Sequence, residues 1–186
     1  MDGELVAPSR FTMTRVAMCM AMSLCILLAG CYPDLDWRPL TPPDARFTVL
    51  MPAKSQEDSR PIAGGATMHM WSTKAGDTVF GAGYADYPDD ARNHFGAVRD
   101  ALIGKSGNKV AEDREITLHG MTGRAVRIDA AADGKSANAR TVHIRLFSAG
   151  TRLYQLAVIS RQDSISEEDI ALYFDSFKIQ SVSGGS

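Results

Sequence analysis

Apolar residues recur at every second position over much of the chain between residues 47 and 160, and this alternation constrains the fold more than any other feature. Successive side chains on a strand point to opposite faces of a sheet, so the pattern predicts strands with a buried face. Short turns at Gly120, Asp133-Gly134 and Ala149-Gly150 favour antiparallel neighbours. The predicted strands, about six to seven in one mostly antiparallel sheet, are 47–51, 68–71, 78–87, 115–118, 123–129, 141–147 and 153–160.

One segment within this region follows helical spacing instead. From Ala91 to Leu102, apolar residues recur every three or four positions. Asp89 or Asp90 is placed to cap the start of this helix, and Gly104 fits just past its end.

A second helix is predicted close to the end of the chain. It is expected to begin near Ser164 or Ser166, and Ser164 with Glu167 has the spacing of a capping box. Strands, a helix, more strands and a final helix in one domain predict the α+β class. The apolar face of the second helix consists of Ile170, Tyr173, Phe174 and Phe177.

All three cysteines lie within the first 31 residues, and Cys31 ends an apolar run from Val16 to Ala29. At ~1.5 Å per residue this run spans about 21 Å, short of the ~30 Å hydrocarbon core of a bilayer. The run therefore predicts a signal peptide over residues 1–30 rather than a transmembrane helix. Because two acidic residues precede Arg15, Met13 is a better start than Met1, although the sequence leaves both open.

The residues Leu28-Ala29-Gly30-Cys31 resemble the lipobox of bacterial lipoproteins. The resemblance implies cleavage before Cys31, which becomes the lipidation site, and two or three acyl chains hold a protein stably on a membrane. Tyr32 stands where an aspartate is typical of inner-membrane lipoproteins, so the resemblance implies the periplasmic face of the outer membrane. After cleavage only Cys31 remains, and the domain must be held by its core without disulfides.

The next segment, residues 31–44, contains four prolines, which disfavour a helix or a central strand. We expect it to be an extended tether that holds the domain away from the membrane. Within it, Trp37 either packs on the domain or rests at the lipid interface. The domain is expected over residues 45–180, followed by a flexible tail at 181–186.

Four segments of the expected domain resemble the PsbP-like/DcrB-like superfamily of small α/β/α sandwich proteins. The similarity covers about residues 44–180. It implies an α/β/α-type sandwich with two main helices, and a role in binding or assembly without a shared catalytic site. The segments are Phe47–Pro52, Tyr84–Pro88, Arg152–Val158 and Phe174–Ile179.

Candidate motifs for other chemistry are weak. The run Gly104-Lys105-Ser106 lacks the first glycine of a phosphate-binding loop. In Met68-His69-Met70, a strand would turn the thioethers and the imidazole to opposite faces, which disfavours a copper site. Aspartates at 86, 89 and 90 fit helix capping better than calcium binding. We therefore expect no catalytic residue, cofactor or metal, although a Ser/His/Asp set assembled by the fold is left open.

The function expected from the sequence is that of a membrane-anchored periplasmic binding or scaffold module. Its partners would be the membrane, through lipid on Cys31, and an envelope protein. A net charge of −2 without a basic stripe argues against nucleic acid. The alternatives are a carrier of a small apolar ligand in a cavity between sheet and helix, and a hydrolase. The sequence leaves the oligomeric state open.

Overall fold

The computed structural model describes residues 35–62, 65–104, 108–130, 139–161 and 164–180. The predicted signal peptide, the lipidation site at Cys31 and the predicted tail at 181–186 lie outside the described residues. None of the described helices combines the length and the apolar character needed to cross a bilayer.

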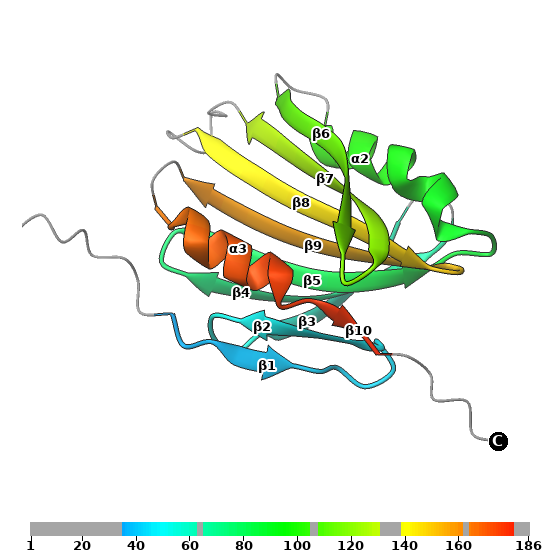
Figure 1. The fold of residues 1–186 in the computed structure, drawn as a ribbon, viewed down its shortest axis with the longest axis horizontal. Helices are drawn as coiled ribbons and strands as arrows, with labels where there is room; N and C mark the ends of the chain where they lie inside the picture. Colours follow the sequence, from blue (N-terminus) through cyan, green and yellow to red (C-terminus); the bar gives the residue numbers. More distant parts are fainter. Residues whose placement is uncertain (1–34, 63–64, 105–107, 131–138, 162–163, 181–186) are drawn as a thin grey trace, which may run out of the picture. The chain divides into compact units, whose positions relative to one another are not determined.

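The main sheet has seven strands in the order β3-β4-β5-β9-β8-β7-β6, and every neighbouring pair is antiparallel (Figure 1). Six of these strands overlap ranges predicted from the alternation; β3 is the addition. A mostly antiparallel sheet is therefore confirmed. The strands are β3 (Gln56–Pro61), β4 (Thr67–Ala75), β5 (Thr78–Asp86), β6 (Lys109–Leu118), β7 (Met121–Ala130), β8 (Arg140–Ala149) and β9 (Arg152–Arg161).

A separate antiparallel sheet of three strands has the order β1-β2-β10. Its central strand alternates as predicted, with Phe47, Val49 and Met51 buried. The first predicted strand is therefore a strand, but it belongs to the small sheet rather than to the main one. The three strands are β1 (Arg38–Leu40), β2 (Phe47–Met51) and β10 (Lys178–Ile179).

Residues 35–44, expected to belong to the tether, lie against the domain. Leu35, Trp37 and Leu40 pack on the hydrophobic core, and Trp37 meets Phe80 edge-on with ring centroids 5.9 Å apart. Pro39 is accommodated because β1 is an edge strand, where a missing N–H breaks no ladder bond. Within the described residues, packed structure thus begins before residue 45.

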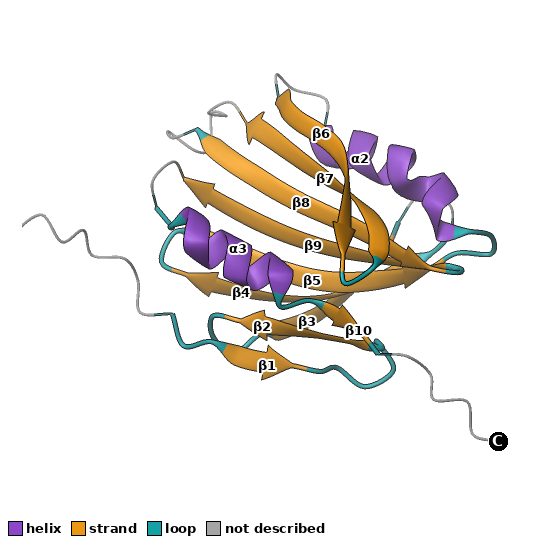
Figure 2. Ribbon diagram, viewed as in Figure 1, coloured by secondary structure: helices purple, strands orange, loops and turns teal. Residues whose placement is uncertain are grey.

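Helical segments cover both faces of the main sheet (Figure 2). On one face lies η2 (Ala91–His94), which continues into α2 (Phe95–Ile103). On the other face lie α3 (Glu167–Asp175) and the small sheet. The layer on this second face thus consists of a helix and a small sheet, and the molecule is richer in sheet than a strict α/β/α sandwich.

Two apolar clusters fill the spaces on either side of the main sheet. Neighbouring residues on β9 belong to different clusters: Leu153 packs beneath η2 and α2, and Tyr154 packs beneath α3 and β2. The alternation along the strands therefore supplies both cores at once. The largest fully buried side chains in the cluster between the main sheet, α3 and the small sheet are Phe47, Phe80, Phe147, Tyr154, Tyr173 and Phe177.

The helix ends follow the predicted caps with one correction. Asp90 accepts a hydrogen bond from the Arg92 amide, and Gly104 ends α2 with φ 69°. The second helix is capped by Ser166, whose hydroxyl accepts from the Asp169 amide. The capping box expected from Ser164 is not formed: α3 begins after Ser166, and the Ser164 hydroxyl donates to the carbonyl of Arg161 at the end of β9.

Candidate functional site

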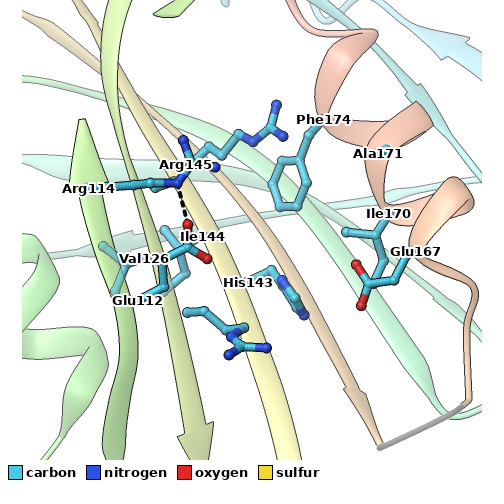
Figure 3. A pocket seen from close by; sticks show the side chains of 12 residues that line it. Glu112, Arg114, Val126, His143, Ile144, Arg145, Glu167, Ile170, Ala171 and Phe174 are labelled. Atoms are coloured by element: carbon cyan, nitrogen blue, oxygen red, sulfur yellow. Dashed lines mark hydrogen bonds and ion pairs between the residues drawn. The ribbon is translucent and has the colours of Figure 1, made fainter. Parts of the chain in front are cut away.

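A groove of about 220 Å³ lies between the main sheet and α3, and we call it the α3 groove (Figure 3). One wall is formed by side chains of β6, β7 and β8, and the other by side chains of α3. Charged groups dominate the sheet side, and apolar groups dominate the helix side. The lining residues are Glu112, Arg114, Ala125, Val126, Arg127, His143, Ile144, Arg145, Glu167, Ile170, Ala171 and Phe174.

Small side chains leave room for the groove. On the groove face of β7, Gly123 and Ala125 precede Arg127 at alternate positions, and α3 contributes Ala171. A Cβ on Gly123 would lie 2.5 Å from the ring of Phe147, so that ring fills the space beside the strand. After Met121 at the start of β7, the next bulky group along this face is therefore the guanidinium of Arg127.

The strand register gathers the charged groups into two rows across the sheet. In the first row, Glu112 pairs with Arg127, and Arg127 pairs with His143. In the second row, Ala125 lies between Arg114 and Arg145. Residues paired across antiparallel strands share a face, so the side chains in both rows reach the groove from the same side of the sheet.

Two of the three arginines in the groove already have carboxylate partners. Arg114 forms an ion pair with Glu112 on its own strand. Arg145 forms one with Asp175 at 2.7 Å, and its guanidinium lies 4.6 Å from the Phe174 ring centroid. Arg127 makes no hydrogen bond or ion pair with any other residue that the structure describes, and its side chain is exposed. It is therefore the guanidinium most available to a ligand.

His143 is half-buried at the β8 end of the first row, beside Arg127. Burial lowers the pKa of its imidazole, and the positive charge of Arg127 acts in the same direction. The carboxylates of Glu167, Glu112 and Asp129 oppose that shift. The lowered pKa favours the neutral ring at neutral pH, and a neutral ring offers one hydrogen-bond donor and one acceptor. The groove can therefore bind an anion at Arg127 and a polar group at His143.

Two other histidines, His69 and His94, have structural partners. His69 stacks on Tyr84, while Met68 and Met70 pack on the opposite face of the sheet, as the alternation predicted. His94 stacks on Tyr87 with ring centroids 3.8 Å apart and bonds Asp89 at 2.6 Å. Within the described ranges, no three His, Cys, Asp or Glu residues gather closely enough to hold a metal ion.

The acidic cluster divides among different partners. Asp90 caps η2, and Asp89 bonds His94 and Asn93. Asp86 faces the other way and forms a two-fold hydrogen bond with Arg152, at 2.7 Å for each contact. The carboxylates at 86, 89 and 90 are thus used in capping and ion pairing.

Among the described residues, one serine–histidine pair lies within reach for proton transfer. The Ser59 hydroxyl is 2.9 Å from Nδ1 of His69, across the β3–β4 pair. Among the described residues, no side chain forms a hydrogen bond with the second ring nitrogen. Ser59 lies on β3, an edge strand whose six residues are all exposed. A nucleophile needs an oriented base and a shielded site, and this pair has neither.

Sequence reasoning did not identify the α3 groove. A signal was present, because His143 and Arg145 occupy the same face of a predicted strand whose other face is apolar. The phosphate-loop resemblance cannot be followed, since residues 105–107 lie outside the described ranges.

No protein-family model and no curated protein matches this sequence. Among solved structures, a protein of Bacteroides thetaiotaomicron aligns at TM-score 0.47 and 8% identity, covering 77% of this chain. This chain spans about half of that protein (48%). The Ran-binding protein Mog1p of Saccharomyces cerevisiae aligns at TM-score 0.46 and 9% identity, covering 78% of this chain and 96% of Mog1p.

PsbP (CyanoP) of Synechocystis sp. PCC 6803 aligns at TM-score 0.47 and 9% identity, covering 82% of this chain and 95% of PsbP. PsbP is the family that the sequence motifs resemble. Because identity is so low and each TM-score is below one half, none of the three similarities establishes a family or a function for this chain.

Proposed function

We propose that this chain is a lipid-anchored binding module of a bacterial envelope, with a PsbP-like domain whose α3 groove binds a small solute through an anionic group. The attachment is at Cys31, and the expected location is the periplasmic face of the outer membrane. The lipobox resemblance and the residue after the cysteine support these two statements.

A single observation carries the binding proposal: Arg127 lines a groove together with two further arginines, and its guanidinium has no hydrogen-bond or ion-pair partner among the residues that the structure describes. The lining has three arginines and two glutamates, while the whole chain has a net charge of −2. Guanidinium groups bind carboxylate and phosphate through paired, charge-assisted hydrogen bonds. The local excess of arginine therefore selects an anionic group, and the small volume selects a small solute.

The test is calorimetric titration of the purified protein with small carboxylates and phosphates at low and high salt. We expect binding that weakens with salt. Arg127→Ala should weaken it about tenfold, the loss of roughly 1.4 kcal/mol from charge-assisted hydrogen bonding. The matched control is Arg92→Ala, which removes an exposed arginine from η2 on the other face of the sheet. Equal affinity in the Arg127→Ala and Arg92→Ala variants would contradict the proposal.

Lipid attachment has an independent test. Mass spectrometry of the N-terminal peptide from membrane-purified protein should show an acylated Cys31, and Cys31→Ser should release the protein from the membrane fraction. An unmodified Cys31 in the wild-type protein would contradict the attachment and leave the groove proposal standing.

The two alternatives meet different difficulties. A carrier of an apolar ligand needs an apolar cavity, whereas the α3 groove has charged groups along its sheet wall. For a hydrolase, the serine–histidine pair that the described residues offer is Ser59 and His69, and Ser59 lies on an exposed edge strand. Hydrolysis of a model ester that disappears in Ser59→Ala would favour the hydrolase.

A further inference from the structure

The described chain is already fixed to the domain at Leu35, only four positions after Cys31. Leu35 packs on the core, and the Asp36 amide donates to the carbonyl of Pro52 at 2.9 Å. From Arg38 to Leu40 the chain is paired with β2. The length of chain free to separate the domain from a lipid on Cys31 is therefore much shorter than the tether predicted over residues 31–44.

Covalent geometry limits how far Cys31 can lie from the domain. An extended chain advances at most ~3.6 Å per residue, so the four steps from Cys31 to Leu35 span no more than about 14 Å. A thiol that carries acyl chains lies at the surface of the bilayer. The part of the domain around Leu35 is then held within about 14 Å of that surface.

We infer that the surface around Leu35, Asp36, Trp37 and Lys54, which we call the anchor end, faces the lipid bilayer that holds Cys31. This inference rests on the lipid attachment proposed above. Trp37 contacts Phe80, and Phe80 is paired across the strands with Thr73. The Thr73 hydroxyl donates a hydrogen bond to the carbonyl of Lys54, so Lys54 belongs to the same end. The partner is thus a membrane surface.

The register also places the α3 groove near the bilayer. Phe80, which Trp37 contacts, is followed across the sheet by Val158, His143 and Arg127. Strands are spaced ~4.8 Å apart, so His143 is two strands, about 10 Å, from Phe80, and Arg127 is one strand further. The groove and the anchor end thus lie on the same face and near the same end of the main sheet. A solute that enters the groove does so close to the membrane.

The opposite end of the sheet provides a reference position. Thr151 is exposed in the turn between β8 and β9, and the neighbouring Arg152 pairs with Asp86. Asp86 lies six residues along β5 from Phe80, which corresponds to about 20 Å. A label at position 151 should therefore lie farther from the bilayer than a label at position 54.

The experiment measures energy transfer to an acceptor lipid in phosphatidylethanolamine–phosphatidylglycerol vesicles. The full chain is expressed in bacteria with an azide-bearing residue at position 54 or 151, purified from membranes, labelled with a donor dye and reconstituted. Transfer from position 54 should exceed that from position 151 about twofold, because of the ~20 Å difference along the strands. A flexible Gly/Ser insertion between Tyr32 and Pro33 should lower the transfer from position 54 and bring the two values together.

Equal transfer from both positions with the native linker would overturn the inference. The mass of the purified protein reports separately on acylation of Cys31. If that cysteine is unmodified, the attachment proposal fails. Coupling the Cys31 thiol to a maleimide lipid then tests, in the same vesicles, whether the short segment from Cys31 to Leu35 holds the anchor end near the bilayer. The two failures are thereby distinguished.

Discussion

Two arginines on the same face of the main sheet are used in opposite ways. Arg152, on β9, forms two hydrogen bonds with Asp86, donates to the carbonyl of Asp44 at 2.5 Å and lies 4.0 Å from the Tyr84 ring centroid. Arg127, on β7, has no hydrogen-bond or ion-pair partner among the described residues. The side chain of Arg152 is only 16% exposed, whereas Arg127 is open to solvent.

The difference shows which charges hold the fold and which are free for another partner. The loop that Arg152 contacts contains two non-glycine residues with positive φ, Asp44 at 62° and Arg46 at 57°. Such backbone conformations cost free energy and persist only where surrounding contacts impose them. Arg152 supplies one such contact and joins the loop to β5 and β9, while Arg127 forms no hydrogen bond or ion pair with any other described residue.

The largest expected effect is the loss of Arg152. Arg152→Ala should lower the free energy of unfolding by about 2–3 kcal/mol, because it removes charge-assisted hydrogen bonds and a cation–π contact. Urea denaturation monitored by tryptophan fluorescence measures this. The matched control, Arg127→Ala, should stay within about 0.5 kcal/mol of the wild type. Similar losses in the two variants would refute the contrast between paired and free arginine.

The second effect is sensitivity to acid at the paired arginine. The hydrogen bonds from Arg152 hold the pKa of Asp86 below its usual range, although partial burial opposes this shift. The unfolded chain therefore takes up the proton at a higher pH than the folded protein does. The stabilisation is complete above the usual pKa of aspartate, ~3.9, and is lost as the pH falls through the lower pKa of the folded state.

Asp86→Asn should accordingly flatten the dependence of stability on pH in this acid range. Unfolding measured between about pH 5 and pH 2 checks the slope. An unchanged slope in Asp86→Asn would show that other carboxylates cause the acid sensitivity.

Most of the fold was predictable because alternation reports burial directly. Six strands of the main sheet and both helices lie where the apolar spacing predicts them. The unpredicted strands lack that signal. β3 has six exposed residues and is held by its backbone pairing with β4, and β10 has only two residues. β1 is an edge strand that contains Pro39, and the four prolines of residues 31–44 predicted a tether there instead.

The α3 groove was not predictable because it depends on which strands are neighbours. The alternation places His143 and Arg145 on one face of β8, but it does not give the register of β7 or β6. The pairing of β6 with β7 also shifts between Val110 and Glu112, which changes the face that later residues of β6 present. Charges that meet only through this register cannot be recognised along the chain.

A third expected effect concerns Arg145, whose pairing is intermediate. Its ion-pair partner Asp175 has a side chain that is 61% exposed, so solvent screens the pair, but the Phe174 ring adds a second contact. Arg145→Ala should therefore cost about 1 kcal/mol, between the values for Arg152 and Arg127. Asp175→Asn is the companion variant, which removes the ion pair and keeps the contact with the ring. A loss in Asp175→Asn as large as that in Arg145→Ala would show that the ring contributes nothing.

The smallest expected effect is a change in the pKa of His143, which reports the free charges of the groove. Burial is the main cause of the lowered pKa, so single substitutions shift it only modestly. Arg127→Ala should raise the pKa by removing a nearby positive charge, and Glu167→Gln should lower it by removing a nearby negative charge. The measurement is an NMR titration of the ring protons, with the His143 signal assigned through His143→Gln.

The opposite signs of these two shifts make the test specific. A general loosening of the groove would admit water in both variants and raise the pKa in both, because burial is what lowers it. Arg92→Ala, on the far face of the sheet, should leave the titration unchanged. If Arg127→Ala does not move the pKa of His143, the guanidinium is too far from the imidazole for the two groups to bind one solute together, and the proposed site would be reduced to the arginine alone.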